Sequence, residues 1–308
     1  MEQYAKTPLT FDEQADLLSS RGIVGSRSLI RDRLSSVNYY RLSGYLYPYR
    51  EADGSNDFRI GTTFETVWNH YAFDRRLRLL LLDAIERIEI ALKTQFAYHH
   101  AHSNAQSPFA YTDCSIFREE SGNRHADLLE RLGKEIGRKS KHIIVRHFRE
   151  KYGQGDLPIW MAVEFMSFGT LQRFYRGADQ RGVQAPLASY FHIPVPVLRS
   201  WLHVLNVIRN QCAHHERVWN CVLDVKPFIP RKPEYPDWHS PTAIQNDRIF
   251  SILTICQYCL SIIAPQSHWR ERLLSLLNDY PVVNPRHMGF PDNWRESPLW
   301  HAPPTPNP

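Results

Sequence analysis

The chain lacks any apolar run of the length that a membrane-spanning helix needs. Its longest candidate, residues 249–264, is interrupted by Ser251, Gln257 and Ser261, whereas a helix that crosses a bilayer needs about 20 predominantly apolar residues. The first residues, MEQYAKTPLTFDEQ, contain no apolar core of the kind found in a secretory signal peptide. We therefore expect a cytoplasmic protein, in which residues 249–264 form a buried helix.

Cysteine is scarce. The 308 residues include five cysteines, an odd number scattered along the chain, which favours reduced thiols over a disulfide framework. Cys256 and Cys259 form a C-x-x-C pair inside an apolar stretch, where two small buried side chains are the usual outcome. The pair is therefore interpreted as part of the core.

Familiar cofactor and metal signatures are also missing. The chain has no Gly-rich phosphate loop and no serine nucleophile elbow. Cys212, His214, His215 and Cys221 carry side chains that bind zinc, but their spacing fits no regular zinc finger, and ligands from one helix end converge poorly. We expect neither a metal nor a cofactor.

The chain has only a small excess of positive charge. The 37 Lys and Arg and the 32 Asp and Glu give a formal net charge of +5, which is compatible with a nucleic-acid partner without establishing one. Hydrophobic residues make up 43% and charged residues 22% of the chain, as in ordinary globular proteins. The length of 308 residues is enough for one large domain or two modest domains, each with a hydrophobic core.

Hydrophobic periodicity predicts an all-α protein. Residues 1–60 are expected to form a helix-turn-helix-like unit with a short hairpin, in which 38–50 pairs with a return strand at 58–60. Residues 61–280 are expected to form a helical bundle with a basic helical insertion at about 104–152, and residues 281–308 a tail with a frayed end. The helices are expected at about 10–21, 26–37, 63–102, 124–138, 140–151, 158–169, 170–176, 180–190, 194–217, 241–263 and 267–277.

The most informative stretch is Arg209–His214, RNQCAH, which we call the motif. It lies in the expected helix 194–217, whose apolar face is predicted to contain Val197, Trp201, Val204, Leu205, Ile208, Cys212 and His215. The opposite line carries His203, Asn206, Asn210, His214 and Arg217, with Arg209 at its edge. This line has no Lys, Asp or Glu, which a plain solvated face normally has, so we expect it to face a cleft or a second subunit.

The motif has the side chains for cutting RNA without a metal. Arg209 is a permanent cation that can hold phosphate, and His214 can move protons near neutral pH. The 2′-hydroxyl of the RNA would be the nucleophile. Asn210 lies one helical turn before His214, so it is expected to orient the imidazole. The alternative from spacing alone is an arginine and a histidine that merely cap and solvate a helix end.

With these residues in view, the chain resembles the Abi-like abortive-infection family of bacteria (the AbiD/AbiF type), a branch of the HEPN superfamily. The resemblance lies in SVNYYRLSGYLYPYR at 36–50, LPIWMAVEFMSFGTLQRFY at 157–175, IRNQCAHHERVWN at 208–220 and MGFPDNW at 288–294. It implies a HEPN-like helical bundle and a role in phage defence or as a toxin. It also implies RNA cleavage through Arg209, Asn210 and His214, and association with a small structured RNA.

Other residues have two readings each. Glu164, in a mostly apolar segment, is expected to be buried, either in a structural ion pair or at the site; His215 and Arg217 are further supporting candidates. Two sets of residues are candidates for RNA binding. The alternative for the first set is a small aromatic core, and the alternative for the second is an ordinary solvated basic face. The two sets are Tyr39, Tyr40, Arg41 and Tyr45, and then Arg138, Lys139, Lys141 and Arg146.

The sequence thus favours a metal-independent endoribonuclease that works as a homodimer, because acid–base catalysis favours two protonatable groups and the chain has one clear motif. RNA is the expected partner, as substrate and as a small structured non-coding RNA. Two alternatives remain open. One is a non-catalytic protein that holds a structured RNA, and the other is a protein-interaction scaffold.

Overall fold

The computed structural model describes residues 7–103, 107–153 and 155–301. Within these ranges the chain forms helices and isolated β-bridges but no sheet, so the predicted all-α class is confirmed. None of the described helices combines the length and apolar character that crossing a membrane requires. The α-helices are α1 (Phe11–Ser20), α2 (Arg27–Ser36), α3 (Tyr39–Leu46), α4 (Phe64–Ser103), α5 (His125–Arg138), α6 (Ile143–Tyr152), α7 (Ile159–Phe165), α8 (Phe168–Gly177), α9 (Ala185–Tyr190), α10 (Val195–Ala213), α11 (Ile249–Ile263) and α12 (Trp269–Asp279).

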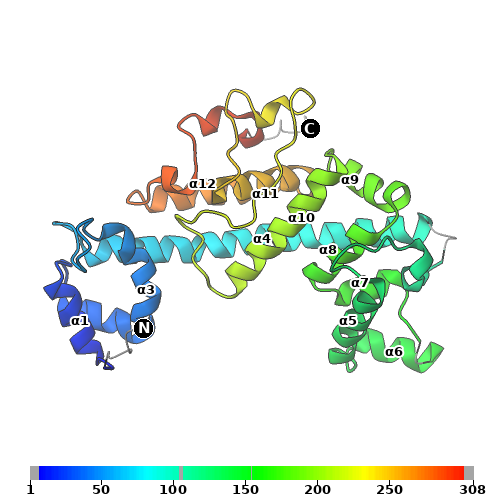
Figure 1. The fold of residues 1–308 in the computed structure, drawn as a ribbon, viewed down its shortest axis with the longest axis horizontal. Helices are drawn as coiled ribbons and strands as arrows, with labels where there is room; N and C mark the ends of the chain where they lie inside the picture. The colour runs from blue at the N-terminus through cyan, green and yellow to red at the C-terminus, as the bar shows by residue number, and fades with distance from the viewer. Residues whose placement is uncertain (1–6, 104–106, 154, 302–308) are drawn as a thin grey trace.

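Helix α4 is the spine of the molecule. Its 40 residues span about 60 Å at 1.5 Å per residue. Helices α1 to α3 lie at its N-terminal end, α5 to α8 lie at its C-terminal end, and α10 to α12 pack along its middle (Figure 1). The buried positions recur at helical spacing along much of its length. One long helix therefore joins regions that lie far apart in space.

The N-terminal unit is built from local signals. Thr10 caps α1 in a capping box with Glu13, whose backbone N–H lies 3.2 Å from the threonine hydroxyl. Arg27 at the start of α2 forms ion pairs of 2.6 Å with both Asp12 and Asp16 of α1. These contacts link the start of α2 to α1, in line with the expected two-helix outline.

The hairpin predicted after α2 is wrong. Residues 39–46 form α3, and pairing is limited to an isolated antiparallel bridge between Arg50 and Phe58. Asn38 caps this helix by accepting a hydrogen bond from the backbone N–H of Tyr40 at 2.7 Å. Leu42, Tyr45 and Leu46 are buried together, so the apolar period here is helical rather than alternating.

The C-terminal part also differs from expectation. Helix α11 begins at Ile249 rather than near 241, and the segment after α12 packs on it instead of forming a separate tail. Trp300 is buried, stacks on Phe250 at 5.6 Å between ring centroids, and donates a hydrogen bond of 3.2 Å to Thr254 Oγ1. The tail end at 302–308 lies outside the described residues.

Candidate functional site

Helix α10 has one buried and one polar face, as predicted. The buried face contains Val197, Trp201, Val204, Leu205, Ile208 and Cys212. On the other side, His203, Asn210 and His214 are exposed, and Asn206 is half-buried. Neither Lys, Asp nor Glu occurs on that line. The polar line therefore faces outward from His203 to the C-terminal end of α10.

The helix ends inside the motif. Its last residue is Ala213, and His214 is the C-cap, whose backbone N–H still donates to the carbonyl of Asn210 at 2.9 Å. His215 has a φ of 63°, the left-handed conformation that commonly terminates helices. The predicted end at 217 and the predicted core position of His215 are both wrong: the chain leaves the helix before His215, and that side chain is exposed.

Arg209, Asn210 and His214 are all exposed at this helix end. Arg209 Nη1 donates a hydrogen bond of 3.3 Å to Asn210 Oδ1. Within the described residues, the side chain of Asn210 makes no hydrogen bond to the imidazole of His214. Asn210 thus holds the arginine of the motif rather than its histidine.

A buried carboxylate on α4 supports the turn that follows the motif, residues 214–219, which we call the post-motif turn. Asp74 Oδ1 accepts hydrogen bonds from the backbone N–H groups of Val218 at 3.1 Å and Trp219 at 2.7 Å. Asp74 Oδ2 accepts from the Tyr45 hydroxyl at 2.5 Å and forms an ion pair with Arg78. Burial raises the pKa of Asp74, while Arg78 and the three hydrogen-bond donors oppose this rise.

Three arginines hold the same turn through backbone carbonyls. Arg78 Nη1 lies 3.3 Å from the carbonyl oxygen of Glu216, and Arg41 Nη1 lies 2.5 Å from that of His215. Arg217 Nη1 reaches back to the carbonyl of Gly44 in α3 at 2.5 Å. Because α3 and α4 both contact the turn, the N-terminal unit forms one side of the site.

The tyrosines of α3 divide into two groups. Tyr40 is exposed and Tyr39 is half-buried. The predicted RNA contact of Tyr45 is wrong, because its side chain is 2% exposed and stacks on Trp219 at 6.2 Å between ring centroids. Burial, with the neighbouring Asp74, raises the pKa of the Tyr45 hydroxyl. For Tyr45 the aromatic-core reading holds.

The second predicted RNA-binding set lies elsewhere. Arg138, Lys139, Lys141 and Arg146 are exposed on and between α5 and α6, at the other end of α4 from α3 (Figure 1). Glu164 in α7 is exposed and forms no ion pair within the described residues, so its expected burial is wrong. The side chain points to solvent because Ala162 and Val163 take the buried positions of this short helix.

The supporting pair Asp74 and Arg78 was not predicted from the sequence. Both residues lie on the buried face of α4, next to Leu77 and Leu81. Two opposite charges four residues apart on an otherwise apolar helix face predict a buried ion pair, because charges are seldom buried without a partner. No group of three or more His, Cys, Asp or Glu side chains that could hold a metal occurs in the described parts of the chain.

Comparison with known proteins gives one match. The family model of the Abi-like proteins matches residues 32–220, a segment that begins within α2 and ends just beyond the post-motif turn. No curated protein sequence matches, and no solved structure matches. The matched segment contains the motif and the residues of α3 and α4 that hold the post-motif turn.

Proposed function

The chain belongs to the Abi-like protein family, and from this premise we propose that it is a metal-independent endoribonuclease of the HEPN type. Membership of this family suggests a role in abortive infection, a form of bacterial phage defence, and a toxin–antitoxin system is the related setting. One observation carries the proposal: Arg209 and His214 are both exposed at a helix end whose following turn is held by α3 and α4. Such support keeps a catalytic group in place.

The proposed reaction is an intramolecular transesterification of RNA. The 2′-oxygen attacks the adjacent phosphorus and loses its proton to a base, while the bond from phosphorus to the 5′-oxygen breaks and that oxygen gains a proton. Arg209 stabilises the added negative charge on the phosphoryl oxygens. The products are a 2′,3′-cyclic phosphate and a 5′-hydroxyl. No redox partner or cofactor enters this balance.

The side chains must supply the positive charge for this step. A helix C-terminus carries about half a negative charge and does not attract phosphate by itself. Arg209 has no ion pair within the described residues and gives only one nitrogen, Nη1, to Asn210, so the rest of its guanidinium can bind an anion. Arg41 and Arg217 bring further cations to the same turn, and each uses one nitrogen for a backbone carbonyl.

A homodimer would complete the acid–base pair. One His214 can serve as base or as acid, and a second copy of the chain would supply the other group across a two-fold axis. Sedimentation equilibrium and cleavage rates over a range of protein concentrations test this idea. We expect specific activity to fall as the dimer dissociates on dilution. Constant activity across that range would show that a single chain suffices.

The second candidate is a non-catalytic RNA-binding protein. The observation that favours it is the exposed basic set Arg138, Lys139, Lys141 and Arg146, which lies at the opposite end of α4 from α3. Cations so far from the motif suit contacts to the backbone of an extended or structured RNA. Such a protein would hold a small non-coding RNA without cutting it.

Cleavage of labelled RNA in the presence of EDTA separates the two candidates. We expect the wild type to give 2′,3′-cyclic phosphate and 5′-hydroxyl ends, and His214→Ala to bind RNA without cutting it. His268→Ala is the matched control, because His268 is an exposed histidine at the start of α12 without a capping hydrogen bond. Equal cleavage by wild type and His214→Ala would refute the nuclease mechanism. RNA binding without cleavage by either protein would favour the second candidate.

A further inference from the structure

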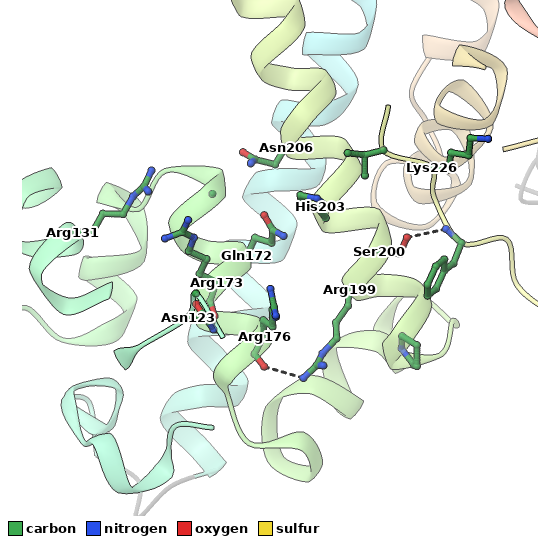
Figure 2. Close-up of a pocket in the computed structure, with 15 residues that line it drawn as sticks. Asn123, Arg131, Gln172, Arg173, Arg176, Arg199, Ser200, His203, Asn206 and Lys226 are labelled. Carbon is green, nitrogen blue, oxygen red and sulfur yellow. Dashed lines mark hydrogen bonds between the residues drawn. The ribbon is translucent and has the colours of Figure 1, made fainter. Parts of the chain in front are cut away.

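A basic pocket of about 670 Å³ lies beside the polar line of α10. Its walls come from the turn at 122–123, α5, α8, residues 196–206 of α10 and the loop at 225–228 (Figure 2). Five of the lining residues are Arg or Lys, and none is Asp or Glu. The five cations are Arg131, Arg173, Arg176, Arg199 and Lys226. A concave surface of this composition concentrates positive potential and attracts anions.

Two of the five cations are available for a ligand. Arg173 and Lys226 are exposed and have no ion pair within the described residues. The other three are paired with carboxylates: Arg131 with Glu135 at 3.5 Å, and Arg176 and Arg199 with Glu120, at 2.5 Å and 3.5 Å. Arg199 is further held by the side chain of Gln184 and the carbonyl of Arg176, both at 2.9 Å. The pocket therefore combines a rigid basic wall with two unengaged positive groups.

The pocket and the motif lie on the same line of α10. His203 and Asn206 line the pocket, and Asn210 and His214 continue this line toward the end of the helix. Arg209 lies six positions after His203, or about 9 Å along the helix axis. A chain of phosphates in the pocket would therefore lead directly to the motif.

An exposed aromatic side chain also lines the pocket. Phe228 is 57% exposed, and its backbone N–H donates a hydrogen bond of 2.8 Å to Ser200 Oγ. The same ring lines an adjoining pocket of about 720 Å³, together with Val197, Ile229 and Tyr235. Positive groups thus lie beside an aromatic face with open space next to it. This is the combination that binds phosphate and an unpaired base together.

We propose that this pocket, between α8 and α10, is a binding subsite for single-stranded RNA. The inference rests on the proposed function and specifies its substrate. Arg173 and Lys226 bind phosphates of the strand, and Phe228 stacks on a base that has no pairing partner. A duplex presents no free base face to Phe228, so unpaired RNA is preferred. The strand leaving the pocket along α10 delivers a phosphate to Arg209 and His214.

Binding of a short fluorescent single-stranded 2′-O-methyl RNA tests the proposal, because this RNA has no free 2′-hydroxyl and cannot be cleaved by the proposed reaction. Fluorescence anisotropy over a range of salt concentrations gives the affinity and its salt slope. We expect the double variant Arg173→Ala, Lys226→Ala to bind more weakly. The slope of log K against log salt should be smaller by about 1.4, or 0.7 for each lost phosphate contact. A residue with a merely structural role would not change this slope by that amount.

Two further variants sharpen the test. Phe228→Ala should weaken binding by about fivefold or more without changing the salt slope, because stacking involves no counterion release. Lys134→Ala is the control for charge: Lys134 lies on α5 like Arg131, outside the pocket, in an exposed pair with Glu130. It should bind like the wild type. A duplex competitor should displace the labelled strand poorly from the wild type.

Failure of the subsite and failure of the nuclease can be distinguished. Wild-type affinity and salt slope in the double variant would overturn the subsite, whatever the cleavage assay shows. Equal competition by duplex and single strand would overturn the preference for unpaired RNA. Loss of binding in the pocket variants, combined with no cleavage by any protein, would support the subsite and refute the nuclease.

Discussion

Asp74 Oδ1, buried in the first half of α4, lies 2.7 Å from the backbone nitrogen of Trp219, just beyond the motif. The same oxygen also accepts from the backbone of Val218. A single carboxylate therefore supports the chain at the point where it leaves the site. This relationship makes the position of the motif depend on the long central helix, and it leads to the first prediction.

Asp74→Ala should strongly destabilise the protein. The change leaves Arg78 as an unpaired buried charge and removes the acceptor of two backbone N–H groups. The free energy of unfolding should fall by about 3–5 kcal/mol, as when one partner of a buried ion pair is removed. Urea unfolding measures this quantity. Asp279→Ala breaks the exposed pair with Arg76 and should cost less than about 1 kcal/mol; equal costs for the two variants would contradict the assigned role of Asp74.

Arg41→Ala should reduce cleavage while leaving stability nearly unchanged. Arg41 is exposed, and its hydrogen bond to the carbonyl of His215 holds the turn directly after His214. A displacement of about 1 Å at a catalytic group can cost up to about 100-fold in rate, so we expect a loss between a few-fold and that limit. Single-turnover cleavage provides the rate, and thermal unfolding provides the stability. Arg31→Ala removes a half-buried arginine on α2 that pairs with Asp32, and it should leave both unchanged.

Arg209→Ala should lower the single-turnover rate by about 10²–10³, the usual cost of removing one group that stabilises transition-state charge. Arg209→Lys keeps the charge but loses the planar guanidinium, so its rate should lie between those of wild type and Arg209→Ala. Arg181→Ala removes an exposed arginine from the turn before α9 and should retain the wild-type rate. A wild-type rate in Arg209→Ala would rule out phosphate stabilisation by this residue.

The protein should lose stability in mild acid. Burial lowers the pKa of His100 from 6.5 to about 4, and its Nδ1 has no hydrogen-bond partner in the described structure. The unfolded chain takes up this proton near pH 6.5, whereas the folded chain takes it up only near pH 4. Unfolding therefore becomes easier as the pH falls through this window, by up to about 3 kcal/mol.

Urea unfolding at pH 7 and at pH 5 measures the contribution of His100. His100→Leu cannot bind the proton, so its free energy of unfolding should fall less between the two values than that of the wild type. Burial also lowers the pKa of His70, which therefore contributes a remaining loss of the same sign. An equal fall in wild type and His100→Leu would show that His100 is not responsible.

Local patterns predicted the long helices well, because their apolar positions repeat over many turns. The spine α4 and the buried face of α10 are examples. The prediction of secondary structure failed where a few residues determine the backbone conformation. At Tyr39–Leu46 the abundance of aromatic residues favoured a strand, yet the Asn38 cap and three buried side chains make it a helix. At His215 a single left-handed residue ends the periodicity on which the sequence argument depended.

Contacts between residues that are distant in the chain could not be predicted from the sequence, for a different reason. Nothing near Asp74 in the chain indicates that it bonds to Trp219, and nothing near Arg173 indicates that it shares a pocket with Lys226. Glu164 shows the opposite error: apolar neighbours in the sequence suggested burial, but the helix turns this carboxylate outward. Motif residues can be named from local spacing, whereas their supporting groups come from packing.

The contacts between α3 and the post-motif turn also set the order in which the site can form during synthesis. Arg41 and His215 are separated by 174 positions in the chain, and Gly44 and Arg217 by 173. Contacts between such distant partners form late in folding, because a long loop must close first. These contacts therefore cannot form until Arg217 has emerged from the ribosome. Synthesis that stops early would leave the motif without its supports, so a truncated product would lack a finished site.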